Sequence, residues 1–289
     1  MKTFKVHDVE FRGQVRRVEY TTANKEGELL KKYVNVYVPY GYDEDPEKKY
    51  NILYLMHGGG GNPDAWLDAS AIKNELDHAF MEKEAEPFIV AFPTYYEKGA
   101  KSDKNEHSPA GDGEKVLAFQ KELREAVIPA VEGTVRTYAD TTDFEGLKAS
   151  RKHRGFGGFS MGSVTTWYAF LCNLDIIADF LPLSGDCWVV ETMGGNKHPE
   201  ETAEKLCESV KEKGYTKDDF RIFAATGTED IAYPNLTPQI EAMKAFPEVF
   251  DFNEDYEQGN FHYLTVEGYY HTYPSVAEYV YNYMPYLFK

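Results

Sequence analysis

Residues 158–162 read Gly-Phe-Ser-Met-Gly, the G-x-S-x-G pattern that places a serine on a sharp turn between a strand and a helix. An apolar run at 155–159 leads into Ser160, and a stretch of helical character at 163–170 follows it. Small flanking residues leave room for such a turn, which raises the hydroxyl above the edge of a sheet. The N–H of Met161, at the start of the helix, would then face a developing oxyanion. The pattern predicts a nucleophilic serine; the alternative is an ordinary glycine-rich turn.

A serine hydroxyl becomes nucleophilic when a base removes its proton, and in hydrolases with this motif the base follows the serine in the chain. Three histidines lie downstream. His262 falls inside an apolar run at 261–266, which predicts a side chain in the core or at a strand edge. His198 lies in a loop with no acid in a predictable relation to it. His271 follows the last expected strand and precedes the final helix, so we expect it to be the base.

The acid that orients the histidine should follow one of the later strands of the sheet. Two carboxylates, Glu229 and Asp230, come directly after the expected strand 220–226. Asp230 is preferred, because its spacing leaves room for a helix and a strand before His271. Asp186, which ends the preceding strand, is the competing candidate, although a substrate contact or a loop cap fits it better.

A second glycine-rich segment, His57 followed by four glycines, closes another apolar run. Glycines let backbone amides approach an oxyanion without obstruction by side chains. We expect the amide of Gly59 to be the second oxyanion donor, with Gly60 as the less favoured choice, and His57 to be structural. A phosphate-binding loop fits less well, because no Lys-Ser/Thr pair follows the glycines.

Aromatic side chains in loops near this chemistry could form a pocket for sugar rings or phenolic acyl groups, because they combine flat apolar faces with polar tips. Ordinary packing is the alternative for each of them. Trp188, next to the end of a strand, is the preferred pocket wall. The expected substrate-binding residues are Trp188, Gly60, Asp186 and Tyr233.

Composition limits the partners of this chain. Its 289 residues carry a net charge of −17, which argues against nucleic acid or an anionic membrane as a partner because phosphate would be repelled. No H-x-x-x-H or clustered carboxylate pattern surrounds the candidate histidines, so we expect no metal site. The three cysteines show no CxxC spacing and are expected to be free thiols.

No stretch of 18 apolar residues occurs, so no membrane span is expected. The first residues lack an apolar run after the lysines, which predicts no signal peptide and a cytoplasmic protein, or a secreted one if a leader was removed.

Strand-like and helix-like segments alternate after a β-rich beginning. This order predicts an α/β fold of the α/β-hydrolase type, with a mostly parallel sheet and helices on both faces, in a single domain spanning 1–289. The alternating segment 33–39 ends in a proline and suits an early or edge strand. We expect further strands at 51–57, 87–93, 155–159, 180–183, 220–226 and 261–266, and helices at 68–82, through 119–128 and at 276–287. A polar loop is expected at 94–113, with 97–113 either a surface excursion or a flap near the site.

Three segments together resemble the feruloyl esterases of carbohydrate esterase family one, which are esterase D-like α/β-hydrolases. These segments are 50–60, 153–162 and 223–233, and the likeness runs from about Glu28 to Phe288. It is greatest to the esterase modules joined to bacterial cellulosomal xylanases.

The resemblance implies hydrolysis, without a cofactor, of the ester that joins ferulate to arabinose on arabinoxylan or its oligosaccharides. It implies the roles of nucleophile, acid and base for Ser160, Asp230 and His271, oxyanion amides at Met161 and Gly59, and a binding role for Trp188. The alternatives are an acetylxylan, siderophore or S-formylglutathione esterase, or a non-catalytic carbohydrate-binding relative. The oligomeric state is left open.

Overall fold

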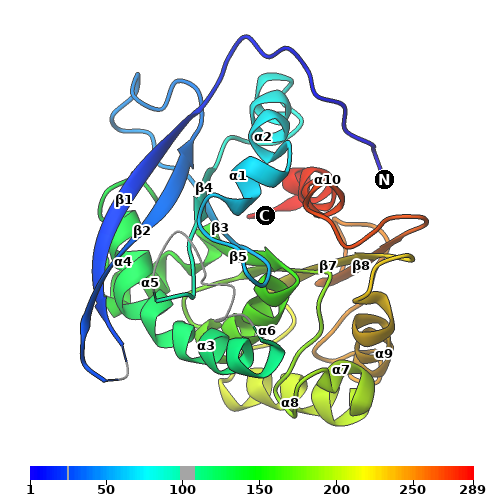
Figure 1. Ribbon diagram of the computed structural model, residues 1–289. Helices are drawn as coiled ribbons and strands as arrows, with labels where there is room; N and C mark the ends of the chain where they lie inside the picture. Colours follow the sequence, from blue (N-terminus) through cyan, green and yellow to red (C-terminus); the bar gives the residue numbers. More distant parts are fainter. Residues whose placement is uncertain (25, 98–107) are drawn as a thin grey trace.

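The computed structural model describes residues 1–24, 26–97 and 108–289 (Figure 1). Within these residues eight strands form one sheet in the order β1-β2-β4-β3-β5-β6-β7-β8. β1 and β2 pair antiparallel, as do β2 and β4, and every pair from β4 to β8 is parallel. The expectation of a mostly parallel sheet is therefore confirmed. The strands are β1 (Gln14–Ala23), β2 (Leu29–Val38), β3 (Ile52–Met56), β4 (Ile89–Phe92), β5 (Arg154–Phe159), β6 (Asp179–Leu183), β7 (Arg221–Gly227) and β8 (Phe261–Val266).

Helices cover both faces of the sheet, and Figure 1 shows α1, α2 and α10 on one side with α3, α6 and α8 on the other. The first group is α1 (Ala65–Ala69), α2 (Ile72–Met81) and α10 (Tyr273–Tyr283). The second is α3 (Pro109–Glu122), α4 (Ile128–Glu132), α5 (Phe144–Ala149), α6 (Met161–Asn173), α7 (Gly194–Lys197), α8 (Pro199–Glu212) and α9 (Tyr233–Met243). A π-helical turn, Leu123–Val127, joins α3 to α4, and short 3₁₀ turns lie at Arg151–His153 and Met284–Tyr286.

The central strands are apolar on both faces because helices cover both. In β3, Tyr54 and Met56 pack into the core beneath the larger group of helices, whereas Leu53 and Leu55 pack against the helices of the other face. All four side chains are fully buried. The unbroken apolar run at 52–56 follows directly from this double burial.

Two expected boundaries are wrong. The helix expected at 68–82 is two helices, α1 and α2, separated at residues 70–71. The polar loop expected to reach residue 113 ends earlier, because α3 begins at Pro109. Ser108 caps this helix by accepting the Gly111 N–H at 3.2 Å. The rest of the proposed flap, residues 98–107, lies outside the described residues.

The expected strand 33–39 is longer and more central than its pattern indicated. It is an early strand, as one of the two expectations had it, but it begins at Leu29 and lies between β1 and β4 and not at the sheet edge. β1 takes the edge, and the expected elements omitted it because about half of its side chains are exposed and several are charged.

A buried ion pair fixes the amino end of β5, the strand that leads to Ser160. The Arg154 guanidinium donates to both carboxylate oxygens of Glu132 in α4, at 2.5 and 2.8 Å, and its side chain is 1% exposed. It also donates to the carbonyls of Leu147 and Ile176 at 3.0 and 2.6 Å. A buried ion pair of this kind adds little to the free energy of unfolding compared with a well-packed apolar pair. Loss of one partner, however, leaves a buried charge without compensation and is strongly destabilising.

We therefore expect Arg154→Ala to lower the free energy of unfolding by about 3–5 kcal/mol in urea titrations. The control is Lys49→Ala, which breaks an exposed ion pair with Asp140 and should leave the unfolding midpoint unchanged. Equal midpoints for the two variants would contradict the anchoring role of Arg154.

Candidate active site

Ser160 occupies a strained turn between β5 and α6. Its φ and ψ are 58° and −115°, and such a positive-φ backbone costs a non-glycine residue on the order of 1–3 kcal/mol. The turn is held by the Ser160 N–H, which donates to the Leu183 carbonyl at 3.0 Å. Glycine is required on both sides: a Cβ on Gly158 would lie 2.7 Å from the Gly162 backbone, and one on Gly162 would collide with the Met56 carbonyl oxygen. The structure thus has the strand–turn–helix geometry that the motif indicated.

The structure brings Ser160, His271 and Asp230 together from three segments far apart in the chain. His271 Nε2 lies 2.9 Å from Ser160 Oγ, and His271 Nδ1 lies 2.6 Å from Asp230 Oδ1. Because a carboxylate only accepts, Nδ1 carries the proton and Nε2 is free to accept from the serine hydroxyl. This is the orientation in which an imidazole can serve as a general base toward Ser160.

Asp230 is positioned by the loop that follows β7. Its side chain is fully buried, and Oδ1 also accepts the Ala232 N–H at 2.7 Å. Its neighbour Glu229 is exposed to solvent. The structure therefore places Asp230, and not Glu229, beside the histidine.

Two backbone amides near Ser160 are candidates for the oxyanion donors. Met161 is the first residue of α6, where helix N–H groups have no partner within the helix. Gly59 lines the same cleft, and its N–H has no acceptor among the described residues. The Gly60 N–H is instead bonded to the Tyr96 hydroxyl at 2.8 Å. The arrangement favours Met161 and Gly59 over Gly60 as oxyanion donors.

These groups open into a cleft of about 430 Å³ at the carboxyl ends of the parallel strands. Phe159 lines this cleft, and its ring centroid lies 4.5 Å from that of His271 and 4.9 Å from that of Tyr273. The cleft is lined by Gly58, Gly59, Ala69, Phe159, Ser160, His271, Thr272, Tyr273 and Pro274.

Asp186 is a loop cap in this structure. Its two carboxylate oxygens accept the Trp188 Nε1–H at 3.0 Å and the Gly195 N–H at 2.9 Å, and the residue is 3% exposed. Burial raises the pKa of this carboxyl group. With both oxygens engaged, Asp186 orients Trp188 and is not available to substrate. Tyr233, the first residue of α9, is half-buried and does not line the cleft.

The remaining histidines take other roles. His262 is buried in β8, as expected, with Nδ1 2.9 Å from the Asn253 carbonyl. His198 is paired with an acid that its sequence position did not reveal, since Nε2 lies 2.8 Å from a Glu191 carboxylate oxygen. Neither contacts Ser160.

His57 is structural and neutral. Nδ1 lies 2.7 Å from the Gly58 carbonyl and must donate to it, so Nε2, 2.7 Å from Thr94 Oγ1, accepts from that hydroxyl. Burial lowers the pKa of His57 to about 4, and the charge of Lys32 acts in the same direction. The neutral ring therefore joins the glycine segment to the end of β4.

The sequence did not reveal the part played by Tyr273 and Thr94. The Tyr273 hydroxyl accepts the Gly58 N–H at 3.0 Å, and Thr94 holds His57. The one available signal for Tyr273 was its place two residues after His271.

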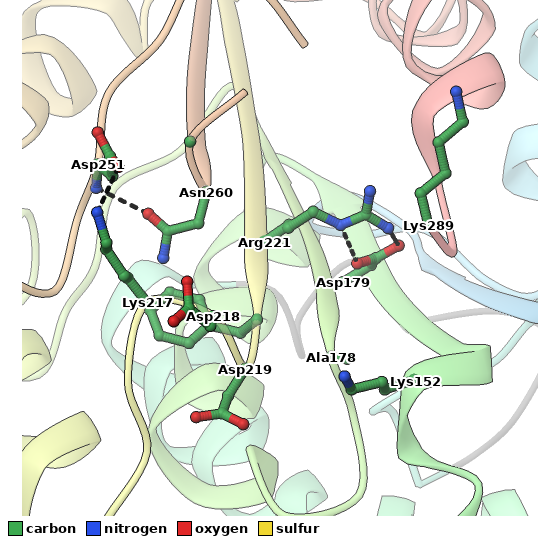
Figure 2. Close-up of a pocket in the computed structure, with 12 residues that line it drawn as sticks. Lys152, Ala178, Asp179, Lys217, Asp218, Asp219, Arg221, Asp251, Asn260 and Lys289 are labelled. Atoms are coloured by element: carbon green, nitrogen blue, oxygen red, sulfur yellow. Dashed lines mark hydrogen bonds and ion pairs between the residues drawn. The ribbon is translucent and has the colours of Figure 1, made fainter. Parts of the chain in front are cut away.

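A second cavity, of about 250 Å³, lies at the opposite end of the sheet, around the amino ends of β6 and β7 (Figure 2). Its charged side chains largely satisfy one another: Arg221 pairs with Asp179 at 2.9 Å and Lys217 with Asp251 at 2.6 Å. It has no serine or histidine in its lining and stands apart from the site at Ser160.

In the part of the chain that the structure describes, no cluster of three or more His, Cys, Asp or Glu side chains is arranged to hold a metal ion. No helix among those same residues combines the length and apolar character needed to cross a membrane.

Comparison with known proteins places this chain in a family. A family model described as "Putative esterase" matches residues 31–289. Endo-1,4-beta-xylanase Y of Acetivibrio thermocellus is 44% identical over 277 residues, which are 96% of this chain and 23% of that protein. The chain thus spans about a quarter of the length of the relatives that it matches in sequence.

Two solved structures are similar over nearly the whole chain. One, of a protein named FAE, is 42% identical with a TM-score of 0.83 and covers 98% of this chain and 90% of its own. The other is a serine-to-alanine mutant of the feruloyl esterase module from Clostridium thermocellum, complexed with sinapinate. It is 41% identical with a TM-score of 0.80 and covers 99% of this chain and 96% of its own.

The low pKa of His57 predicts a specific loss of stability in acid. In the unfolded chain this histidine titrates near 6.5, so as the pH falls from 7 to 5 the unfolded state binds a proton that the folded state does not. The free energy of unfolding should fall by about 2 kcal/mol from this residue alone. In His57→Gln, urea titrations at pH 7 and pH 5 should show a fall smaller by that amount. An identical fall in wild type and variant would contradict the assignment of a neutral, buried His57.

Proposed function

The chain belongs to this esterase family, and from that membership we propose that it is a serine esterase that hydrolyses feruloyl esters of arabinoxylan or its oligosaccharides. The solved structures at 41–42% identity, one of them a feruloyl esterase module with bound sinapinate, support the hydroxycinnamoyl specificity. The related Acetivibrio protein is named as a xylanase, which supports a sugar of xylan as the alcohol part of the ester substrate.

One observation carries the catalytic part of the proposal. Ser160 Oγ, His271 and Asp230 form a continuous hydrogen-bonded chain whose donors and acceptors are in the order that nucleophilic catalysis requires. The chain ends in an open cleft beside the Gly59 and Met161 amides. Without these amides the oxyanion would lack hydrogen-bond donors, and in a closed core the ester could not reach Ser160. Neither arrangement would favour acyl transfer.

In the first half-reaction, Ser160 Oγ attacks the ester carbonyl carbon as His271 Nε2 takes the hydroxyl proton. Negative charge moves to the carbonyl oxygen, which accepts hydrogen bonds from the Met161 and Gly59 amides. Asp230 stabilises the imidazolium through its bond to Nδ1. The C–O bond to the sugar then breaks, the leaving oxygen takes the proton from His271, and the acyl group remains on Ser160 as an ester.

In the second half-reaction, His271 takes a proton from water as that water attacks the acyl-enzyme carbonyl. The tetrahedral intermediate again places its oxyanion on the two amides. Its collapse breaks the bond to Ser160 Oγ, which regains a proton from His271, and releases the carboxylic acid. These steps use the three side chains, the two backbone amides and one water molecule as the second nucleophile.

Trp188 is not among the residues that line the cleft, and we propose that its ring borders the acyl group where the substrate extends beyond that lining. The indole is held by Asp186, and its edge packs near Gly113 of α3, where an added Cβ would meet the ring at 3.5 Å. The residue is 9% exposed, so most of its surface is packed against the protein. A flat, rigid ring of this kind suits the ring of a phenolic acid better than it suits an acetyl group.

Ser160→Ala should abolish hydrolysis of both methyl ferulate and 4-nitrophenyl acetate, because the variant has no hydroxyl to acylate. The wild type should cleave methyl ferulate efficiently. The measurement is release of ferulate and of 4-nitrophenolate under identical conditions. More than a few per cent of residual activity in the variant would overturn the nucleophile assignment. If the wild type cleaved only the acetate, Ser160 would remain the assigned nucleophile. The proposed substrate would then change to small-acyl or siderophore esters.

Trp188→Ala should lower kcat/KM for methyl ferulate by about 10-fold, the size of one aromatic contact, with a smaller effect on 4-nitrophenyl acetate. Trp188→Phe retains a flat ring and is the matched control, with an intermediate effect. Equal losses on both esters would show that Trp188 supports the fold and does not contact the acyl group.

A further inference from the structure

The Gly58–Gly61 segment presents an oxyanion donor but has no side chains with which to hold its own shape. A glycine-rich backbone loses more conformational freedom on ordering than any other sequence. An oxyanion donor is effective only when it is fixed before the charge develops. The segment must therefore be held by neighbouring groups.

We propose that Tyr96 and Asp112 are positioning residues that fix this segment so that the Gly59 N–H faces the oxyanion. The inference rests on the proposed function and adds two residues that act through the backbone of Gly60. Neither residue lines the cleft, so neither is assigned a contact with substrate.

Two consecutive hydrogen bonds connect Gly60 to Asp112 through Tyr96. The Gly60 N–H donates to the Tyr96 hydroxyl at 2.8 Å, and that hydroxyl donates to Asp112 Oδ2 at 2.9 Å. Both side chains are completely buried, whereas Gly60 itself is exposed. Tyr95 adds a longer contact to the same carboxylate oxygen, at 3.5 Å. The exposed Gly60 is thereby connected to the buried carboxylate of Asp112, in the first turn of α3.

The amides of Gly58 and Gly61 are also engaged. The Gly58 N–H donates to the Tyr273 hydroxyl at 3.0 Å, and the Gly61 N–H donates to the Gly58 carbonyl at 3.1 Å. Gly60 adopts a φ of 72°, which other residues rarely adopt. With its neighbours bonded on either side, the Gly59 amide is directed to the cleft that it lines.

The chemistry of Tyr96 suits this task over a wide pH range. Burial raises its pKa to about 12, so the hydroxyl keeps its proton and donates to Asp112 while accepting from Gly60. A phenylalanine at this position would fill the same space but leave the Gly60 N–H without this acceptor.

The test is Tyr96→Phe, with kcat and KM measured on methyl ferulate and Ki measured for an aryl boronic acid, which forms a tetrahedral adduct with a reactive serine. We expect kcat to fall and Ki to rise by about 10-fold each, a fraction of the effect of losing a whole oxyanion donor. KM should stay within about twofold, because ground-state binding does not use the oxyanion amide.

Tyr37→Phe is the matched control. The Tyr37 hydroxyl is also buried and donates to an aspartate, Asp77, at 2.8 Å, but it lies against α2 and not the glycine segment. Its removal should lower the melting temperature without changing kcat, KM or Ki. A similar loss of activity in both variants would mean that Tyr96 contributes only to stability.

Substitutions at Asp112 give a second test that does not depend on Tyr96→Phe folding. Asp112→Asn keeps an oxygen that can accept from Tyr96, so its kcat should stay within about threefold of wild type, whereas Asp112→Ala should lose about 10-fold. The double variant Tyr96→Phe/Asp112→Ala should lose little more than either single one, because both act through one contact.

Unchanged kcat and Ki in Tyr96→Phe, or equal kcat in Asp112→Ala and Asp112→Asn, would overturn the positioning role. If Ser160→Ala is inactive and wild type cleaves ferulate in the same experiments, this failure leaves the proposed function intact. Ferulate cleavage that survives in Ser160→Ala would instead overturn the function on which the inference rests.

Discussion

The structure depends on one strained residue. Ser160 is held at a positive φ between β5 and α6, and this turn persists because the surrounding packing allows no other path for the chain. Gly158 and Gly162 let α6 approach the end of β3 closely, and the Ser160 N–H is bonded to β6. The ion pair between Arg154 and Glu132 fixes the other end of the same strand. The free-energy cost of the strained backbone at Ser160 is therefore offset by the packing of β5, all of whose residues are buried.

The parallel sheet brings the remaining groups to this turn. Because successive parallel strands end at the same edge, loops after β3, β7 and β8 meet the loop after β5. The loop after β7 supplies Asp230, and the loop after β8 supplies His271. The glycine segment after β3 is different: its shape comes from side chains elsewhere, namely His57, Tyr96 and Tyr273. Rigid strands place the nucleophile and base, whereas buried hydrogen bonds place the oxyanion donor.

Sequence patterns predicted what is local or follows from chain order. The serine motif, the β-α alternation and the position of His271 each have a short-range signature, and the structure brings the expected acid, base and serine together. β1 was missed because an edge strand exposes half its residues, and the start of α3 was hidden by a polar, glycine-containing composition. The link from Tyr96 to Gly60 joins two loops through tertiary packing, which leaves no pattern in the sequence. Asp186 was expected to contact substrate or to cap a loop, and the partners that make it a cap, Trp188 and the Gly195 amide, are visible only in the folded chain.

Reaction with a fluorophosphonate, followed by peptide mass spectrometry, tests the central claim that the strained serine is the nucleophile. The account predicts one phosphonyl group per chain, on the peptide that contains Ser160, with methyl ferulate turnover lost in proportion to labelling. Complete loss of turnover with the label on another residue, or full labelling of Ser160 with turnover unchanged, would contradict it.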